Sequence, residues 1–196
     1  MKKMRIVVQS VLAIVIIVLA YMLYDSVASR VEFYDTLDKR KKVVIERLVK
    51  LRDVQNAFKI AKKRYAGSCD EIMQFILQDS IPLVKIDGTV PDTLTESEAL
   101  KLGILKKDTI LISVKDTLFG SQPFDSICYV PFSQNIKFDF KNGEVEKSGV
   151  KVPVFEISTP YKSFIWDLDY TSNDFDANAL IKVGSLEEPS TSGNWE

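Results

Sequence analysis

The fold is decided at residues 6–24, which read IVVQSVLAIVIIVLAYMLY and contain no charged side chain. Because a helix rises about 1.5 Å per residue, these 19 residues would span about 30 Å, the thickness of the hydrocarbon core of a bilayer. Residues 1–5, MKKMR, form a basic tail in front of this run. We therefore expect a transmembrane helix at residues 6–24 that attaches the rest of the chain to membrane lipid.

The positive charges predict the orientation of this helix. The five-residue tail carries Lys2, Lys3 and Arg5, whereas Arg30 is the only basic residue in the first 14 residues after the apolar run. Short basic tails stay in the cytoplasm. We expect a single-pass protein of the inner (cytoplasmic) membrane, with a cytoplasmic tail at residues 1–5 and an extracytoplasmic, periplasmic head.

A cleaved signal peptide is the alternative interpretation of the same segment. Small residues at Ser26 and Ala28 would suit cleavage after Ala28. However, the apolar run is longer than the 7–15 residues of a typical signal-peptide core, and it continues into a helix-forming stretch. These features favour an uncleaved anchor.

Residues 25–66 are predicted to form an amphipathic helical stalk. The stretch 25–65 has no Gly or Pro, so nothing interrupts a helix that begins in the membrane and is about 60 residues long. Apolar residues recur mostly at spacings of three or four, which is typical of one buried helix face; they are Leu37, Val44, Leu48, Leu51, Val54, Phe58, Ala61 and Tyr65. We expect residues 43–65 to pack on the head and the first turns after the membrane to be exposed or bound by a partner. Gly67 suits the left-handed position that ends a helix.

The charge is divided sharply along the chain. Residues 25–66 contain 12 Lys and Arg against 6 Asp and Glu, whereas residues 67–196 contain 11 Lys and no Arg against 21 Asp and Glu. A basic stalk thus carries an acidic head. The stalk is either simply solvated, or it meets acidic lipid headgroups or an acidic protein surface such as the head of a neighbouring copy.

Residues 67–183 are predicted to form the head, and residues 184–196 a flexible C-terminal tail. Ser68 and Glu71 make a capping box for a helix that buries Ile72, Phe75 and Ile76 and stops before Ile81. A second short helix is expected between Thr95 and Gly103. The expected strands are rich in β-branched and aromatic residues; they are 109–114, 127–130, 136–140, 152–157, 161–166 and 180–183.

Two local signals refine the sheet. Asn142-Gly143 predicts the turn of a β-hairpin, and Pro153 suggests an edge strand. The aromatic residues of the head are expected in the core or on sheet faces; they are Phe132, Phe138, Phe140, Phe155, Phe164, Trp166 and Tyr170. The fold class is α+β: an N-terminal transmembrane helix continues into a long amphipathic helix that backs a small, mostly antiparallel sheet.

Several classes of chemistry are disfavoured by composition. The chain has no His, which removes the commonest general base and every Ser-His-Asp or Cys-His arrangement. Two cysteines, Cys69 and Cys128, are too few for a zinc site without His. They would form one disulfide in an oxidising compartment, or remain two buried thiols. We assign no catalytic, cofactor-binding or metal-ligating residue, and we expect no cofactor, small-molecule substrate or nucleic-acid partner.

One acidic cluster leaves alternatives open. Asp167, Asp169, Asp174 and Asp176 lie within ten residues, and oxygen ligands on a loop suit Ca²⁺. The spacing does not match an EF-hand, because Ser172 occupies the position that needs Gly. A solvated acidic loop is the favoured interpretation. A carboxylate-dependent hydrolase that uses Asp167 and Asp169 is a further alternative.

The layout resembles type IV pilins and the pseudopilins of type II secretion. The resemblance lies in the basic leader, the apolar helix that continues into an amphipathic one, and the residues Val54-Gln55-Asn56-Ala57-Phe58 and Tyr65-Ala66-Gly67-Ser68 that lead into a head. The chain lacks the Gly-Phe processing site and the Glu within the apolar run that the family uses. We expect a non-enzymatic binding or assembly module of the cell envelope that contacts other envelope proteins or copies of itself. The alternative is a pseudopilin-like subunit that self-assembles in a secretion or transport apparatus.

Overall fold

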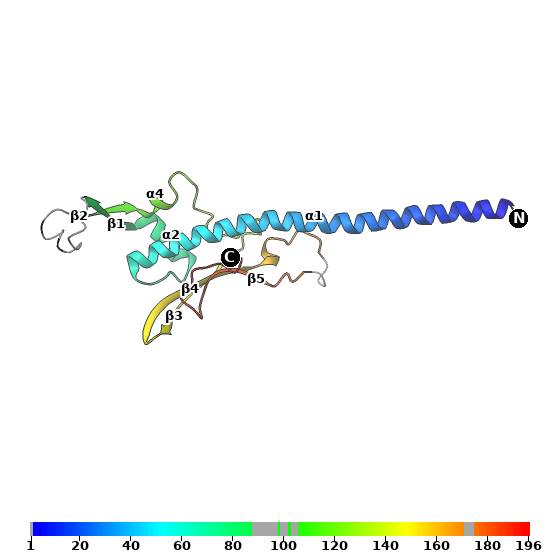
Figure 1. Ribbon diagram of the computed structural model, residues 1–196. Helices are drawn as coiled ribbons and strands as arrows, with labels where there is room; N and C mark the ends of the chain where they lie inside the picture. The colour runs from blue at the N-terminus through cyan, green and yellow to red at the C-terminus, as the bar shows by residue number, and fades with distance from the viewer. Residues whose placement is uncertain (1, 88–97, 99–101, 103–105, 171–174) are drawn as a thin grey trace.

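A computed structural model of the chain describes residues 2–87, 98, 102, 106–170 and 175–196. One long helix carries a small α+β head on its C-terminal half, while its N-terminal half stands alone (Figure 1). The elements follow in this order: α1 (Lys2–Lys62), α2 (Cys69–Gln78), β1 (Ser80–Asp87), β2 (Lys106–Ser113), α4 (Val114–Leu118), β3 (Asp139–Lys147), β4 (Val150–Pro160), the 3₁₀ helix η1 (Tyr161–Ser163) and β5 (Leu180–Ser185). The predicted α+β class is confirmed.

Helix α1 is continuous, as the absence of Gly and Pro predicts. It is the one helix in the described part of the chain that is long and apolar enough to cross a membrane, with an 18-residue window of mean hydropathy 2.3 and no buried residue in that window. The helix ends at Lys62, and Lys63 takes the left-handed conformation with φ 62°. The prediction that Gly67 ends the helix is therefore wrong. Gly67 instead allows a close approach, because a Cβ there would lie 2.7 Å from Oδ1 of Asn142.

The capping signal at Ser68 is confirmed. The hydroxyl of Ser68 accepts a hydrogen bond from the backbone N–H of Glu71 at 3.3 Å, and the Glu71 carboxylate accepts one from the N–H of Gly67 at 2.8 Å. Helix α2 buries Ile72, Phe75 and Ile76 as predicted.

The strands form two separate antiparallel sheets. In the first, β1 pairs with β2 from Ser80↔Ser113 to Asp87↔Lys106. The second has the order β3-β4-β5. Strand β1 was not predicted from the sequence, because it contains Pro82 and proline is unfavourable within a strand.

The β3–β4 hairpin turns at Ser148-Gly149, so the prediction of a turn at Asn142-Gly143 is wrong. Ser148 and Gly149 both have positive φ, 55° and 78°, which a two-residue hairpin turn of type I′ requires. Asn142 lies in mid-strand, where its side-chain amide donates a hydrogen bond to the carbonyl oxygen of Tyr65 at 3.1 Å. This contact with the segment after α1 gives Asn142 a role that a turn position would not allow.

Strand β4 is the central strand of its sheet, but Pro153 itself lies at an edge position, as predicted. Strand β5 pairs with residues 155–160 of β4 only. Pro153 pairs with Glu144 of β3 in the part of β4 beyond that range. Locally, therefore, Pro153 has a strand neighbour on one side, which is where a residue without an N–H is tolerated.

Two predicted strands are not strands. Residues 127–130 form a turn followed by a single bridge, Tyr129↔Lys137. Their backbone pairs with residues 136–138 over this short stretch only, and the side chain of Arg47 binds the carbonyl oxygens of Ser126 and Tyr129. Residues 161–166 form η1 and a turn. The predicted helix between Thr95 and Gly103 lies mostly outside the described residues.

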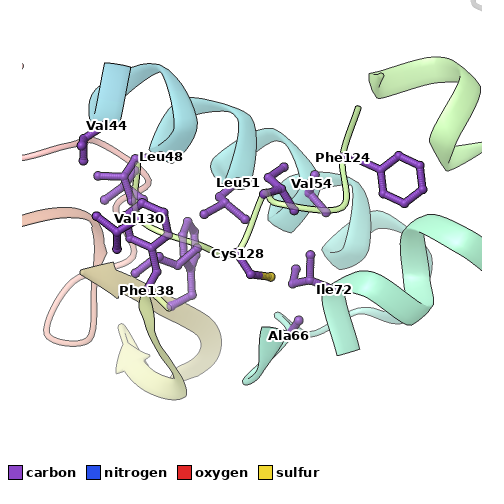
Figure 2. Close-up of a cluster of buried hydrophobic side chains, with 14 of the residues drawn as sticks. Val44, Leu48, Leu51, Val54, Ala66, Ile72, Phe124, Cys128, Val130 and Phe138 are labelled. Atoms are coloured by element: carbon purple, nitrogen blue, oxygen red, sulfur yellow. The ribbon is translucent and has the colours of Figure 1, made fainter. Parts of the chain in front are cut away.

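The core lies between α1, α2 and the three-stranded sheet. The predicted stripe of α1 is buried from Leu37 to Phe58, and Figure 2 shows Val44, Leu48, Leu51 and Val54 directed at the head. Replacing a fully buried leucine by alanine in such a core costs about 2–5 kcal/mol. The stripe is therefore the main attachment of the head to the stalk.

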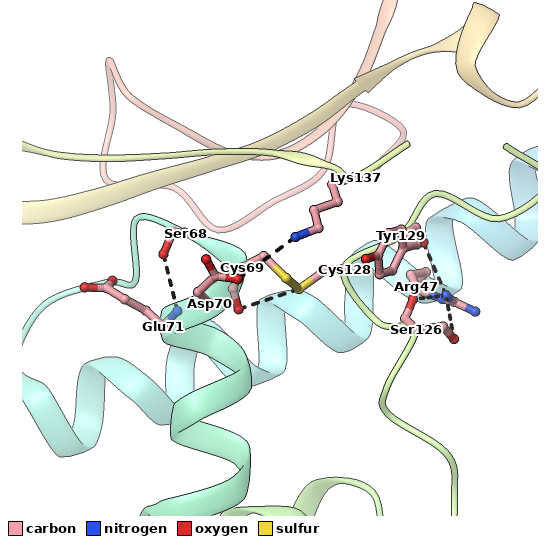
Figure 3. Close-up of a disulfide and its surroundings, with 9 residues drawn as sticks. All are labelled: Arg47, Ser68, Cys69, Asp70, Glu71, Ser126, Cys128, Tyr129 and Lys137. Carbon is pink, nitrogen blue, oxygen red and sulfur yellow. Dashed lines mark hydrogen bonds and ion pairs between the residues drawn. A yellow bond between two sulfur atoms is a disulfide. The ribbon is translucent and has the colours of Figure 1, made fainter. Parts of the chain in front are cut away.

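A disulfide joins the start of α2 to the segment after α4. Cys69 and Cys128 have their Cα atoms 5.9 Å apart and enclose a sequence separation of 59 residues (Figure 3). Of the two states that the sequence left open, the structure has the bridge. It fixes the 127–130 segment against the beginning of α2.

The C-terminal residues 184–196 are not a loose tail, and that prediction is wrong. The side chain of Asn194 accepts a hydrogen bond from the N–H of Lys182 at 3.0 Å and donates one to the carbonyl oxygen of Leu180 at 2.8 Å. Glu196 forms an ion pair with Arg52 of α1 at 2.7 Å. The end of the chain thus closes over β5 and contacts the stalk.

Candidate functional site

The basic stalk binds the acidic head of its own chain. Three cations of α1 and one directly after it pair with head carboxylates: Arg40 with Asp167 at 2.5 Å, Arg52 with Glu196 at 2.7 Å, Lys62 with Asp79 at 3.0 Å and Arg64 with Glu71 at 3.0 Å. The charge division in the sequence is thus satisfied in part within one chain. Neither lipid nor a second copy is needed to explain these four cations.

Arg40 makes the most extensive of these contacts. Its guanidinium donates to both carboxylate oxygens of Asp167, at 2.5 and 2.8 Å, and to the carbonyl oxygen of Phe164 at 2.7 Å. The hydrogen bond from Arg40 holds the pKa of Asp167 below its usual value, and the same bond raises the pKa of Arg40. Such a bidentate pair is specific in its geometry.

This pairing bears directly on the acidic cluster. The guanidinium of Arg40 occupies the position that a cation would take at the Asp167 carboxylate. Oδ1 of Asp176 accepts a hydrogen bond from the backbone N–H of Asn178 at 2.9 Å, and Asp174 lies outside the described residues. Within the described ranges, no three His, Cys, Asp or Glu side chains gather as metal ligands would. Asp169 lines a groove away from this ion pair, so the structure does not join Asp167 and Asp169 into one site.

Two aromatic side chains expected in the core or on a sheet face lie exposed in loops near Arg40. Phe132 is 50% exposed and Trp166 is 56% exposed. The indole N–H of Trp166 donates a hydrogen bond to the carbonyl oxygen of Phe132 at 3.0 Å, and the guanidinium of Arg40 lies over the Phe132 ring, 5.3 Å from its centre. We call Phe132 and Trp166 the aromatic surface.

The backbone of Phe132 makes this surface unusual. Its φ is 61°, a left-handed conformation that is uncommon for a bulky residue and costs on the order of 1–3 kcal/mol. The contacts from Trp166 and Arg40 stabilise this conformation. Strain of this kind concentrates at functional positions. One sequence signal could have revealed it: Phe132 lies in Pro131-Phe132-Ser133-Gln134-Asn135, a turn-forming context and not a strand.

A second feature is a groove of about 390 Å³ where α1 leaves the predicted membrane segment. It is lined by Ser26, Ser29, Arg30, Phe33, Tyr34, Asp169, Tyr170 and Phe175. Phe33 packs on Phe175 with ring centres 5.6 Å apart, and Leu37 is buried. The head therefore reaches further towards the membrane than the predicted limit at residue 43.

No family model, no curated protein and no solved structure matches this chain. The architecture itself, a long N-terminal apolar helix packed on a small antiparallel sheet, is pilin-like. The functional argument therefore rests on the chain's own geometry.

Proposed function

We propose that this protein is a single-pass membrane protein whose extracytoplasmic head acts as a non-enzymatic binding module of the cell envelope, with the aromatic surface as its contact for a partner protein. The observation that carries the proposal is Phe132, a strained residue whose ring is half-exposed beside Trp166. Exposed aromatic and arginine side chains are the groups that dominate protein–protein binding energy.

The membrane address is supported by the composition of α1. Its apolar window has the length and hydropathy of a membrane span, and the tail in front of it is basic. The Cys69–Cys128 disulfide suits an oxidising compartment outside the cytoplasm. These observations support a head on the extracytoplasmic side of the cytoplasmic membrane.

The distance of the aromatic surface from the membrane favours a protein partner over lipid. Arg40, which stacks on Phe132, follows the apolar run by 16 residues, so it lies about 24 Å beyond the end of the span along the helix. Headgroups extend only about 5–8 Å beyond the hydrocarbon core on each side. The surface therefore faces the aqueous space, where envelope proteins would meet it.

The test is a crosslinking pull-down from membranes with the full-length chain. A photoreactive residue at position 134, in the Phe132 loop, captures neighbours in the native envelope. In the double variant Phe132→Ala with Trp166→Ala we expect the captured species to decrease several-fold. The matched control replaces two other exposed apolar residues of the head, Val150 and Leu180, and should leave capture unchanged. Equal capture by both double variants would refute the aromatic surface as the contact.

A pseudopilin-like subunit is the second candidate, favoured by the packing of α1 on an antiparallel sheet. In that case the basic stalk would also meet the acidic head of a neighbour. The structure defines the test, because Arg40 holds its own head and has to be left intact. Reversing the charge of Lys41 and Lys42 should then abolish detergent-resistant oligomers, and oligomers that persist would exclude this candidate.

A further inference from the structure

Helix α1 has a second apolar face just beyond the apolar run. It consists of Tyr24, Val27, Val31 and Tyr34, which are exposed by 73, 62, 63 and 45%. Their spacing of three, four and three residues places them in one row along the helix. We call these four residues the seam.

The seam points away from the head. At about 100° per residue, its centre lies roughly 120° around the helix from the row of Phe33, Leu37 and Val44 that packs on the head. The head therefore leaves Tyr24, Val27 and Val31 accessible, whereas Tyr34, at the upper end of the seam, also borders the groove that faces the head. Nothing in the described residues of the chain itself covers Val27 or Val31.

Lipid does not account for the upper half of the seam. Val31 and Tyr34 follow Tyr24 by seven and ten residues, which is about 10 and 15 Å along the helix. The headgroup layer extends only about 5–8 Å from the hydrocarbon core. Asp25 opposes any shift of the helix that would draw these residues into the bilayer.

We propose that the seam binds the seam of a second copy, as a parallel, in-register helix pair. This inference rests on the membrane anchoring in the proposed function. The bilayer gives every copy the same direction and depth, so Val27 of one copy meets Val27 of the other. Alternating spacings of three and four are those of the a and d positions of a parallel coiled coil.

Residues around the seam fit this arrangement. Within the apolar run, the same row continues through Ala20, Ile17 and Ala13, and small residues let membrane helices approach closely. Outside it, Arg30 and Asp35 occupy flanking positions five residues apart, which lie opposite each other in a parallel pair, so that Arg30 of one copy would come near the exposed ion pair that Asp35 of the other forms with its own Lys39 at 2.6 Å. The next position of the row is Asp38, where two carboxylates would face each other, so the pairing ends at Tyr34.

The test is cysteine crosslinking of the full-length protein in native membranes. Both natural cysteines are bonded to each other, so a single introduced cysteine is the reactive thiol. Mild oxidation should give covalent dimers with Val27→Cys and Val31→Cys, and several-fold less dimer with Glu32→Cys, an exposed neighbour outside the seam. Adding Val31→Asp to Val27→Cys should reduce the dimer several-fold while the Cys69–Cys128 bridge remains intact.

Each alternative result is distinguishable. Equal crosslinking at positions 27, 31 and 32 indicates random collision and overturns the proposal, as does an adduct with the mass of a different protein. Absence of crosslinks from protein that is in the membrane fraction overturns the pairing alone. Absence of the protein from the membrane fraction overturns the proposed function and the pairing together.

Discussion

The buried side chain of Gln55 provides the sharpest test of how the head is attached to α1. Gln55 is fully buried. Its amide donates a hydrogen bond to the carbonyl oxygen of Ala66 and accepts one from the N–H of Ala66, each at 2.9 Å. This pair holds the chain where it turns from the stalk into α2. We predict that Gln55→Leu, which keeps the volume but removes both bonds, destabilises the head.

The magnitude follows from the groups that are left behind. The substitution leaves a buried N–H and a buried C=O of Ala66 without partners, at about 1–3 kcal/mol each, and the added apolar surface offsets part of this. We expect a loss of about 2–4 kcal/mol, and hence a melting temperature lower by roughly 5–15 °C. Trp166 and Trp195 are both in the head, so their fluorescence reports its unfolding in detergent-solubilised full-length protein.

Two further variants make the reasoning refutable. Gln74→Leu replaces an exposed glutamine on α2 and should change the free energy of unfolding by less than about 0.5 kcal/mol. Gln55→Glu should lose stability as the pH rises above about 4, because burial raises the pKa of a carboxyl group and its protonated form alone can donate to Ala66. If Gln55→Leu is no less stable than Gln74→Leu, water satisfies Ala66 and the reasoning fails.

Three other perturbations should separate the remaining contributions. Replacing Cys69 and Cys128 by alanine should lower the free energy of unfolding by about 4 kcal/mol through the entropy of a 59-residue loop, as measured by denaturant titration; an unchanged midpoint would contradict this. Gly184→Ala should lower the free energy of unfolding by more than about 2 kcal/mol in the same titration, since φ is 79° and the added Cβ would collide with the carbonyl oxygen of Phe155. The control Gly149→Ala, where φ is 78° but the space is open, should lower it by about 1 kcal/mol. Equal losses in the two variants would exclude the collision. Because Arg40 lowers the pKa of Asp167, the ion pair stabilises the docked head above about pH 4 and that stabilisation is lost as the pH falls through the lower folded-state pKa. Melting temperature should therefore fall less steeply below pH 4 in Asp167→Asn than in the wild type, and parallel pH profiles would argue against a role for this pair.

Patterns with a strong local cause could be predicted from the sequence. The long helix, the buried row from Leu37 to Phe58 and the cap at Ser68 each depend on residues within a few turns of one another. Helix periodicity and capping operate at that range. The helix, its buried row and its cap were therefore predicted correctly from local sequence.

Features decided by distant contacts could not be predicted in this way. Asn142-Gly143 and Ser148-Gly149 are both acceptable hairpin turns by local rules, and the choice depends on the bond from Asn142 to Tyr65, which lies 77 residues away. The segment 127–130 has strand-like composition, but it forms only an isolated bridge to Lys137, and Arg47 of α1 binds the carbonyl oxygen of Tyr129. The composition of the last residues suggests a flexible tail, but the ion pair between Glu196 and Arg52 fixes the end of the chain against α1.

The candidate site was missed for a related reason. The sequence predicted Phe132 and Trp166 in the core or on sheet faces because aromatic residues are usually buried, and no local rule separates an exposed aromatic from a buried one. Phe132 lies beside Arg40, 92 residues before it in the chain, and beside Trp166, 34 residues after it. Only the tertiary structure brings these residues together.

The division of charge between the basic stalk and the acidic head sets the position of the head along α1. Exposed ion pairs contribute only about 0–1 kcal/mol each, so the buried row of α1 supplies most of the attachment of the head. The pairs at Arg40, Arg52 and Lys62 are spread over about 33 Å of helix. A slide of the head by one helical turn would keep apolar surfaces in contact but would separate all three pairs at once. The apolar row therefore holds the head on the stalk, and the charges determine where along the stalk, and how far from the membrane, the head is held.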